Sequence, residues 1–104
     1  LQKGDSFSAI KALKKALVAD PKFVQAYTNL GTAYLQEGKI EESINSSKKA
    51  LEFEPKFALA HNNLVVAYWA KGDFEEAIKH CDKARELGFE VKPDLVKALE
   101  SYRK

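Results

Sequence analysis

The sequence repeats itself at a fixed step of 34 residues. The clearest matches at this step are three glycines and three alanines: Gly4, Gly38, Gly72, Ala16, Ala50 and Ala84. Asn29 and Asn63 are separated by the same step. A fixed period of this length indicates one supersecondary unit copied along the chain. Stacked copies form a solenoid, whose long concave surface suits binding better than catalysis.

Apolar residues at helical spacing predict six helices within this period. Their expected ranges are 5–19, 22–36, 40–53, 56–70, 74–87 and 93–102. The starts are predicted from capping aspartates and from prolines in the first turn: Asp5, Asp20–Pro21, Pro55, Asp73 with Glu76, and Pro93. The stops are predicted from glycines that can adopt a left-handed conformation: Gly38, Gly72 and Gly88.

The repeats predict a single domain over residues 1–104. Its parts are the second half of a repeat (1–21), two full repeats (22–55 and 56–89) and a C-terminal capping helix (90–104). The sequence contains no Met and starts in the middle of a repeat. We therefore expect it to be a fragment of a longer protein; a processed natural start is the alternative.

The charge balance argues against nucleic acid and against direct membrane contact as the main role. The chain has 17 Lys and Arg against 15 Asp and Glu, a net charge of +2. Cys81 is the only cysteine, so no internal disulfide is expected. No apolar run approaches the roughly 20 residues that span a bilayer. We expect a cytoplasmic protein, with a periplasmic or membrane-tethered parent protein as the alternative.

The repeat resembles the tetratricopeptide repeat, a helix-turn-helix unit of 34 residues. One copy is carried by Tyr27-x2-Leu30-Gly31-x2-Tyr34, Gly38, Ser43, Ser47, Ala50 and Pro55, and the next by His61-x2-Leu64-Val65-x2-Tyr68, Gly72, Ala77, Cys81 and Ala84. The resemblance implies an all-α, right-handed α-solenoid. Five residues depart from the family pattern: Ser47, His61, Val65, Cys81 and Phe89.

The resemblance also implies that the first helix of each unit lines a concave groove. Residues between the core positions of these helices are then expected to face a partner. The candidate groove residues are Gln25, Thr28, Asn29, Thr32, Leu59, Asn62, Asn63, Val66, Trp69, Lys97 and Arg103. We predict that the groove binds an extended segment or a helix of another protein.

Asn29 and Asn63 occupy equivalent positions one repeat apart. An amide side chain donates and accepts at once, so the two asparagines are candidates for a ladder along a peptide backbone. The alternative is that they only support contacts between neighbouring helices. Some family members hold a C-terminal carboxylate with Lys and Arg in the groove. The matching positions here are Leu59 and Asn63, so no such ligand is expected.

Trp69 and two basic residues complete the groove hypothesis. Trp69, the only Trp, is a candidate anchor for a partner side chain, or alternatively a core residue beneath the last helix. Lys97 and Arg103 are candidates to meet an acidic partner, or alternatively charges that solvate a capping helix.

No catalytic or metal site is predicted. His80 and Cys81 are adjacent on one helix and point about 100° apart, so they do not easily share a tetrahedral ion. No third group or oxyanion site completes a nucleophile with them or with His61 and Asp82. We expect a non-catalytic protein without cofactor. The alternative function is self-assembly through the apolar residues of the first helix, Ala9, Leu13 and Leu17.

Overall fold

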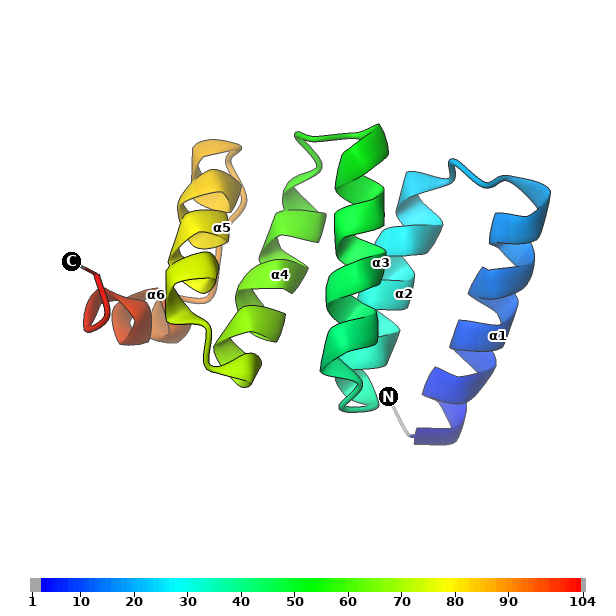
Figure 1. Ribbon diagram of the computed structural model, residues 1–104, viewed down its shortest axis with the longest axis horizontal. Coiled ribbons are helices and arrows are strands. Elements are labelled where there is room, and N and C mark those ends of the chain that lie inside the picture. The colour runs from blue at the N-terminus through cyan, green and yellow to red at the C-terminus, as the bar shows by residue number, and fades with distance from the viewer. Residues whose placement is uncertain (1–2, 104) are drawn as a thin grey trace.

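The computed structural model describes residues 3–103, which fold entirely into helices and loops. The helices are α1 (Lys3–Ala19), α2 (Val24–Gln36), α3 (Ile40–Phe53), α4 (Ala58–Lys71), α5 (Phe74–Glu86) and α6 (Pro93–Glu100). Helices α1 to α5 follow one another across the molecule, whereas α6 lies across the end of α5 (Figure 1). The molecule is elongated, with extents of 43 × 27 × 20 Å.

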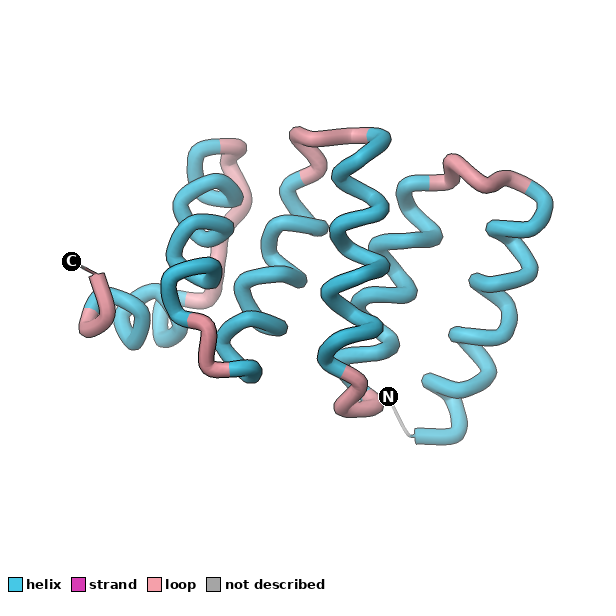
Figure 2. Tube along the Cα trace, viewed as in Figure 1, coloured by secondary structure: helices cyan, strands magenta, loops and turns pink. Residues whose placement is uncertain are grey.

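The helices pack as a solenoid of paired units. Each helix contacts the next along the chain, and α2 also contacts α4, the equivalent helix one repeat later. Short loops join the helices from α1 to α5, as Figure 2 shows. The predicted all-α fold class is therefore confirmed. Within residues 3–103, no helix is both long and apolar enough to cross a bilayer.

The predicted helix stops are confirmed. Gly38, Gly72 and Gly88 have φ values of 74°, 87° and 88°. An L-residue adopts this left-handed region only at a cost, so glycine is the residue that allows the chain to leave each helix and reverse direction. These reversals place α2 against α3 and α4 against α5.

The predicted starts of α2 and α4 are wrong by two residues. Pro21 and Pro55 lie in turns before the helices, not in the first helical turn. The backbone N–H of Phe23 donates to the carbonyl of Asp20 at 3.1 Å, and that of Phe57 to the carbonyl of Glu54 at 3.1 Å. Proline occupies the second position of each four-residue turn, which its fixed φ favours.

The aspartate caps have mixed outcomes. Asp73 Oδ1 accepts from the backbone N–H of Glu76 at 3.3 Å, so the predicted cap of α5 is confirmed. Asp20 Oδ1 accepts from the N–H of Lys22 within the turn and caps no helix. The structure describes α1 from Lys3, so the predicted start of the first helix at Asp5 is wrong, and the side chain of Asp5 lies outside what the structure describes.

The buried apolar side chains form two clusters. The N-terminal cluster joins α1 and α2 through Ile10, Leu30, Ala33 and Tyr34. The larger C-terminal cluster extends from α3 to α6 and consists of Ile44, Leu64, Val65, Ala67, Tyr68, Ala77, Cys81, Ala84, Val91 and Leu99. A thin core divided between neighbouring helices is the expected form for a solenoid.

Small residues bring α2 and α3 close together. A Cβ atom added at Gly31 would overlap Ser47 Oγ and lie 3.1 Å from Asn63 Nδ2. Ser43 Oγ donates to the carbonyl of Gly31 at 2.8 Å. Ala50 is fully buried on the same side of α3. Gly31 thus allows α2 and α3 to cross closely, and a hydrogen bond as well as packing holds the crossing.

The last helix departs from the repeat. α6 ends at Glu100, two residues before the predicted end, and its backbone contacts α5 without the approach to α4 that the repeat would give. The linker before α6 buries Val91, which is only 4% exposed, in the C-terminal cluster. Leu99 is buried in the same cluster and fixes α6 across the end of the solenoid.

Candidate binding groove

Helices α2 and α4 carry the predicted groove, and their sequences are almost free of charge. α2 contains no charged residue, and Lys71 at the end of α4 is the only Lys, Arg, Asp or Glu in that helix. On the side of α2 and α4 that is predicted to face a partner, seven residues are exposed or half-buried. They are Gln25, Asn29, Thr32 and Gln36 on α2, and Leu59, Asn62 and Val66 on α4. We call these seven residues the uncharged strip. Amide and hydroxyl groups dominate it.

Two predicted groove residues, Thr28 on α2 and Asn63 on α4, are buried. Thr28 is 0% exposed and Asn63 is 4% exposed, so the expectation that they face a partner is wrong. The reason is the contact between α2 and α4. Asn63 Nδ2 donates to the carbonyl of Thr28 at 3.0 Å, and Thr32 Oγ1 lies 3.3 Å from Asn63 Oδ1. The amide of Asn63 therefore joins two successive repeats.

The asparagine ladder is therefore wrong for Asn63, whose amide is already used within the chain. Asn29 occupies the same repeat position but is exposed. Its Oδ1 accepts from Gln25 Nε2 at 3.3 Å. It borders an open hollow of about 430 Å³ between α1 and α2, where Ala9, Ala12 and Leu13 supply the opposite wall. Asn29 is free to contact another molecule, whereas Asn63 is not.

Trp69 belongs to an aromatic cluster at the C-terminal end. Its ring centre lies 5.1 Å from that of Phe74 and 6.1 Å from that of Tyr102, both in edge-on geometry. Phe74 and Tyr102 stack with centres 3.9 Å apart. The half-buried indole therefore packs beneath the end of the chain, which favours the alternative in which Trp69 is a core residue.

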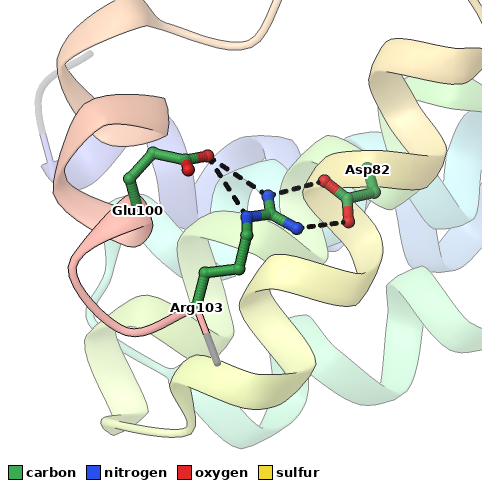
Figure 3. Close-up of polar contacts among 3 residues, drawn as sticks. All are labelled: Asp82, Glu100 and Arg103. Atoms are coloured by element: carbon green, nitrogen blue, oxygen red, sulfur yellow. Dashed lines mark hydrogen bonds and ion pairs between the residues drawn. The ribbon is translucent and has the colours of Figure 1, made fainter.

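Arg103 is held within the chain by two acidic residues. Its guanidinium donates to both carboxylate oxygens of Asp82 at 2.9 Å and to Glu100 Oε1 at 3.3 Å (Figure 3). This contact lowers the pKa of the Asp82 carboxyl and raises that of the guanidinium. The guanidinium ties the chain end to α5 and does not point toward the uncharged strip.

Lys97 is also separate from the strip. It is exposed and borders a second hollow, which is lined by Arg85 of α5 and by Phe89 and Val91 of the linker between α5 and α6. The predicted meeting of Lys97 and Arg103 with one acidic partner therefore lacks a shared surface. Sequence reasoning placed them together because it extended the repeat geometry to α6.

The fold brings two histidines together that the sequence analysis treated separately. His61 on α4 and His80 on α5 have their Nδ1 atoms 2.9 Å apart. Cys81, by contrast, is buried, and burial raises the pKa of its thiol. Among the residues that the structure describes, no three His, Cys, Asp or Glu side chains gather into a metal-binding group. The predicted packing of α4 against α5 in one repeat was the only sequence signal that could have brought His61 and His80 together.

These features define the class of the molecule as a helical repeat protein with an uncharged strip on α2 and α4. Two family models match the sequence: TPR repeat over residues 1–38 and 31–72, and tetratricopeptide repeat over residues 58–88. The chain belongs to the tetratricopeptide repeat family.

Solved structures of MamA are similar to this chain. One is 31% identical with a TM-score of 0.76, covering 81% of this chain and 49% of that one. A second, from AMB-1, is 32% identical with a TM-score of 0.76 and covers 82% and 50%. A MamA variant is 28% identical with a TM-score of 0.69 and covers 79% and 66%. The chain thus spans about half the length of the first two. A search of curated proteins found no match.

Proposed function

We propose that this chain is a non-catalytic interaction module that holds an extended segment of another protein along the uncharged strip. The observation that carries the proposal is a set of amides and one hydroxyl on α2 and α4: Gln25, Asn29, Thr32 and Gln36 are exposed, and Asn62 is half-buried. Such side chains donate to and accept from a peptide backbone. Val66, 36% exposed, adds an apolar contact beside them.

The absence of charge along α2 indicates the character of the partner. A strip without ion pairs binds through hydrogen bonds and apolar contact, which salt screens little. Charged residues concentrate on the second helices of the units, such as Glu41 and Lys48 on α3. The proposed ligand is therefore an uncharged polar and apolar segment, not an acidic or basic tail.

Peptide selection on the immobilised chain tests this proposal. Peptides chosen from a random library are measured by calorimetry against the wild type, the double variant Asn29→Ala/Thr32→Ala and the control Asn45→Ala. Asn45 is an exposed amide on α3, away from the strip. Two lost hydrogen bonds of about 1 kcal/mol each predict at least a tenfold weaker affinity for the double variant. Equal affinity for all three proteins would refute the groove.

A second candidate function is self-association through the N-terminal face. Asn63 is covered by α2, yet no described residue covers the equivalent Asn29 in this way. The hollow beside it has walls of Ala9, Ala12 and Leu13. Val18, further along α1, is 84% exposed. We propose that a helix of a second copy fills this hollow. It would contact Asn29 in the way that α2 contacts Asn63.

Light scattering across a concentration series tests the second candidate. Ala12→Glu places a charge in the hollow without touching the core, because Ala12 is exposed. The wild type is expected to increase in mass with concentration, and Ala12→Glu to remain monomeric. A wild type that stays monomeric at the highest concentration eliminates this candidate and leaves the peptide groove untouched.

A further inference from the structure

The hollow that borders Lys97 contains a basic residue where the repeat has an apolar one. Arg85 stands at the position that Leu17 and Leu51 fill in the earlier units. Both leucines are partly buried and pack against the apolar clusters of the core. Arg85 is exposed instead and lines an open hollow of about 440 Å³. The change from leucine to arginine therefore coincides with an opening in the surface.

The course of the chain between α5 and α6 explains why the surface is open here. The linker over residues 87–92 is longer than the turns over residues 20–23 and 54–57, which join the earlier pairs of helices. It leads from the end of α5 to α6, which lies across the end of α5 and not along it (Figure 1). The linker therefore borders α5 at Arg85, and no helix covers this side chain.

The two cations on the hollow form no ion pair within residues 3–103. Arg85 comes from α5 and Lys97 from α6, and both are exposed. Arg103, by contrast, is held by two carboxylates of the chain. Glu90 is the acidic residue in the lining, so two cations face one carboxylate. The hollow therefore keeps a net positive charge that a ligand can neutralise.

Apolar side chains make up much of the remaining lining. Phe89 and Val96 are half-buried and pack against the C-terminal cluster, of which the buried Val91 is a member. A ligand that covers them removes apolar surface from water, which favours binding. Positive charge together with an apolar floor fits a ligand that has carboxylates beside an apolar group.

From this lining we propose that the hollow docks a segment of another protein in which acidic side chains flank a large apolar side chain. The guanidinium of Arg85 can hold both oxygens of one carboxylate, and Lys97 attracts a second as a point charge. The apolar side chain then covers Phe89 and Val96. Nucleic acid is a poorer match, because its affinity for proteins comes from many phosphate contacts and two cations supply few.

This docking surface differs from the uncharged strip in place and in character. The strip lies on α2 and α4, whereas the hollow is formed by α5, α6 and the linker between them. Exposed ion pairs contribute little and are screened by salt, so we expect weak binding that weakens further as salt is added. Binding to the strip should change little with salt, which separates the two surfaces experimentally.

NMR titration of the ¹⁵N-labelled chain with two matched sets of short peptides tests the proposal. The first set has glutamate on both sides of leucine or phenylalanine, and the second replaces each glutamate with glutamine. Both ends of every peptide are blocked, so that no terminal carboxylate takes part. The glutamate peptides are expected to shift the backbone amide signals of Gly88, Glu90 and Val91. The glutamine peptides are expected to leave these three signals unchanged.

Variants that remove one positive charge identify the groups that bind. Arg85→Gln and Lys97→Gln are each expected to weaken binding of the glutamate peptides about two- to fivefold, and the double variant about tenfold. Both side chains are exposed, so the variants should keep the fold. Lys79→Gln is the matched control, because Lys79 is exposed on α5 but borders a different hollow. It is expected to bind the peptides as the wild type does.

The proposal is overturned by equal affinity for the two peptide sets, by equal losses in Lys79→Gln and Arg85→Gln, or by no binding at millimolar peptide. A single-stranded oligonucleotide that occupies the hollow in preference to the glutamate peptides would also overturn it. The strip variant Asn29→Ala/Thr32→Ala is expected to bind the glutamate peptides as the wild type does. Failure of the hollow and failure of the strip are therefore distinguishable, and the wild-type titration does not depend on how well any variant folds.

Discussion

Replacing Gly31 with alanine sets helix propensity against packing at the contact between α2 and α3. Alanine favours the helical state over glycine by about 1 kcal/mol. The new methyl group, however, overlaps Ser47 Oγ, and Ser47 is fully buried. Overpacking of this kind costs typically about 1–3 kcal/mol. With the helix gain subtracted, we expect Gly31→Ala to destabilise the protein by up to about 2 kcal/mol.

The hydroxyl of Ser47 provides the complementary change. Ser47 Oγ is buried and has no hydrogen-bond partner. Removing a buried, unpaired hydroxyl is therefore expected to be neutral or to stabilise by about 1 kcal/mol. In the Ser47→Ala background, the nearest atom to the new methyl at Gly31 is Asn63 Nδ2 at 3.1 Å, which needs only a small shift. Gly31→Ala should then be nearly neutral.

Urea denaturation of the wild type, both single variants and the double variant measures this coupling. The four free energies of unfolding, followed by circular dichroism, form a double-mutant cycle with an expected interaction of up to about 2 kcal/mol. At that upper value the urea midpoints differ by about 1 M. Equal effects of Gly31→Ala in both backgrounds, or a stabilising effect in the wild type, would refute the packing argument.

Three further predictions concern single contacts. Asn63→Ala is expected to destabilise the protein by about 1–2 kcal/mol because the carbonyl of Thr28 loses its donor, while Asn29→Ala changes the free energy of unfolding by less than about 0.5 kcal/mol. Urea denaturation of both variants compares the two positions. Equal losses would contradict a structural role for Asn63 that Asn29 lacks. Because Arg103 depresses the folded-state pKa of Asp82, the unfolded chain takes up that proton first as the pH falls. The wild type should therefore lose stability as the pH falls below 3.8, the ordinary pKa of an aspartate, and Asp82→Asn should lose less over the same range. Free energies of unfolding measured at pH 7 and at pH 3 test this. Tyr102→Ala is expected to cost about 1 kcal/mol and to shift the fluorescence of Trp69 to longer wavelength, since the indole loses an aromatic neighbour; unchanged emission would show that Tyr102 does not cover it.

The sequence contained enough information for the helix ends that are marked by glycine but not for all of the helix starts. Gly38, Gly72 and Gly88 all adopt the left-handed conformation that ends a helix and that glycine adopts most easily, so these helix ends were predictable. Proline at Pro21 and Pro55 suits both the first helical turn and the second position of a β-turn. Local chemistry does not distinguish these two settings, and the backbone pairing of the turn decided between them.

The candidate site was predictable to the extent that it follows the period. The period placed Asn29 and Asn63 at equivalent positions, but their exposure differs because α2 covers Asn63 and nothing described covers Asn29 in the same way. The contacts of His61 with His80 and of Arg103 with Asp82 join residues 19 and 21 positions apart, His61 and His80 on different helices and Arg103 beyond the last one. They depend on how helices are rotated against each other, which a sequence pattern does not give.

The two faces of α2 differ in how they resist deformation. Toward α1 it presents the apolar cluster of Leu30, Ala33 and Tyr34, and such contacts permit small sliding movements. Toward α3 it presents Gly31, whose carbonyl accepts a hydrogen bond from Ser43 that is directional. When the molecule is stretched along its 43 Å axis, lengthening should therefore concentrate between α1 and α2 while α2 and α3 move as one rigid unit.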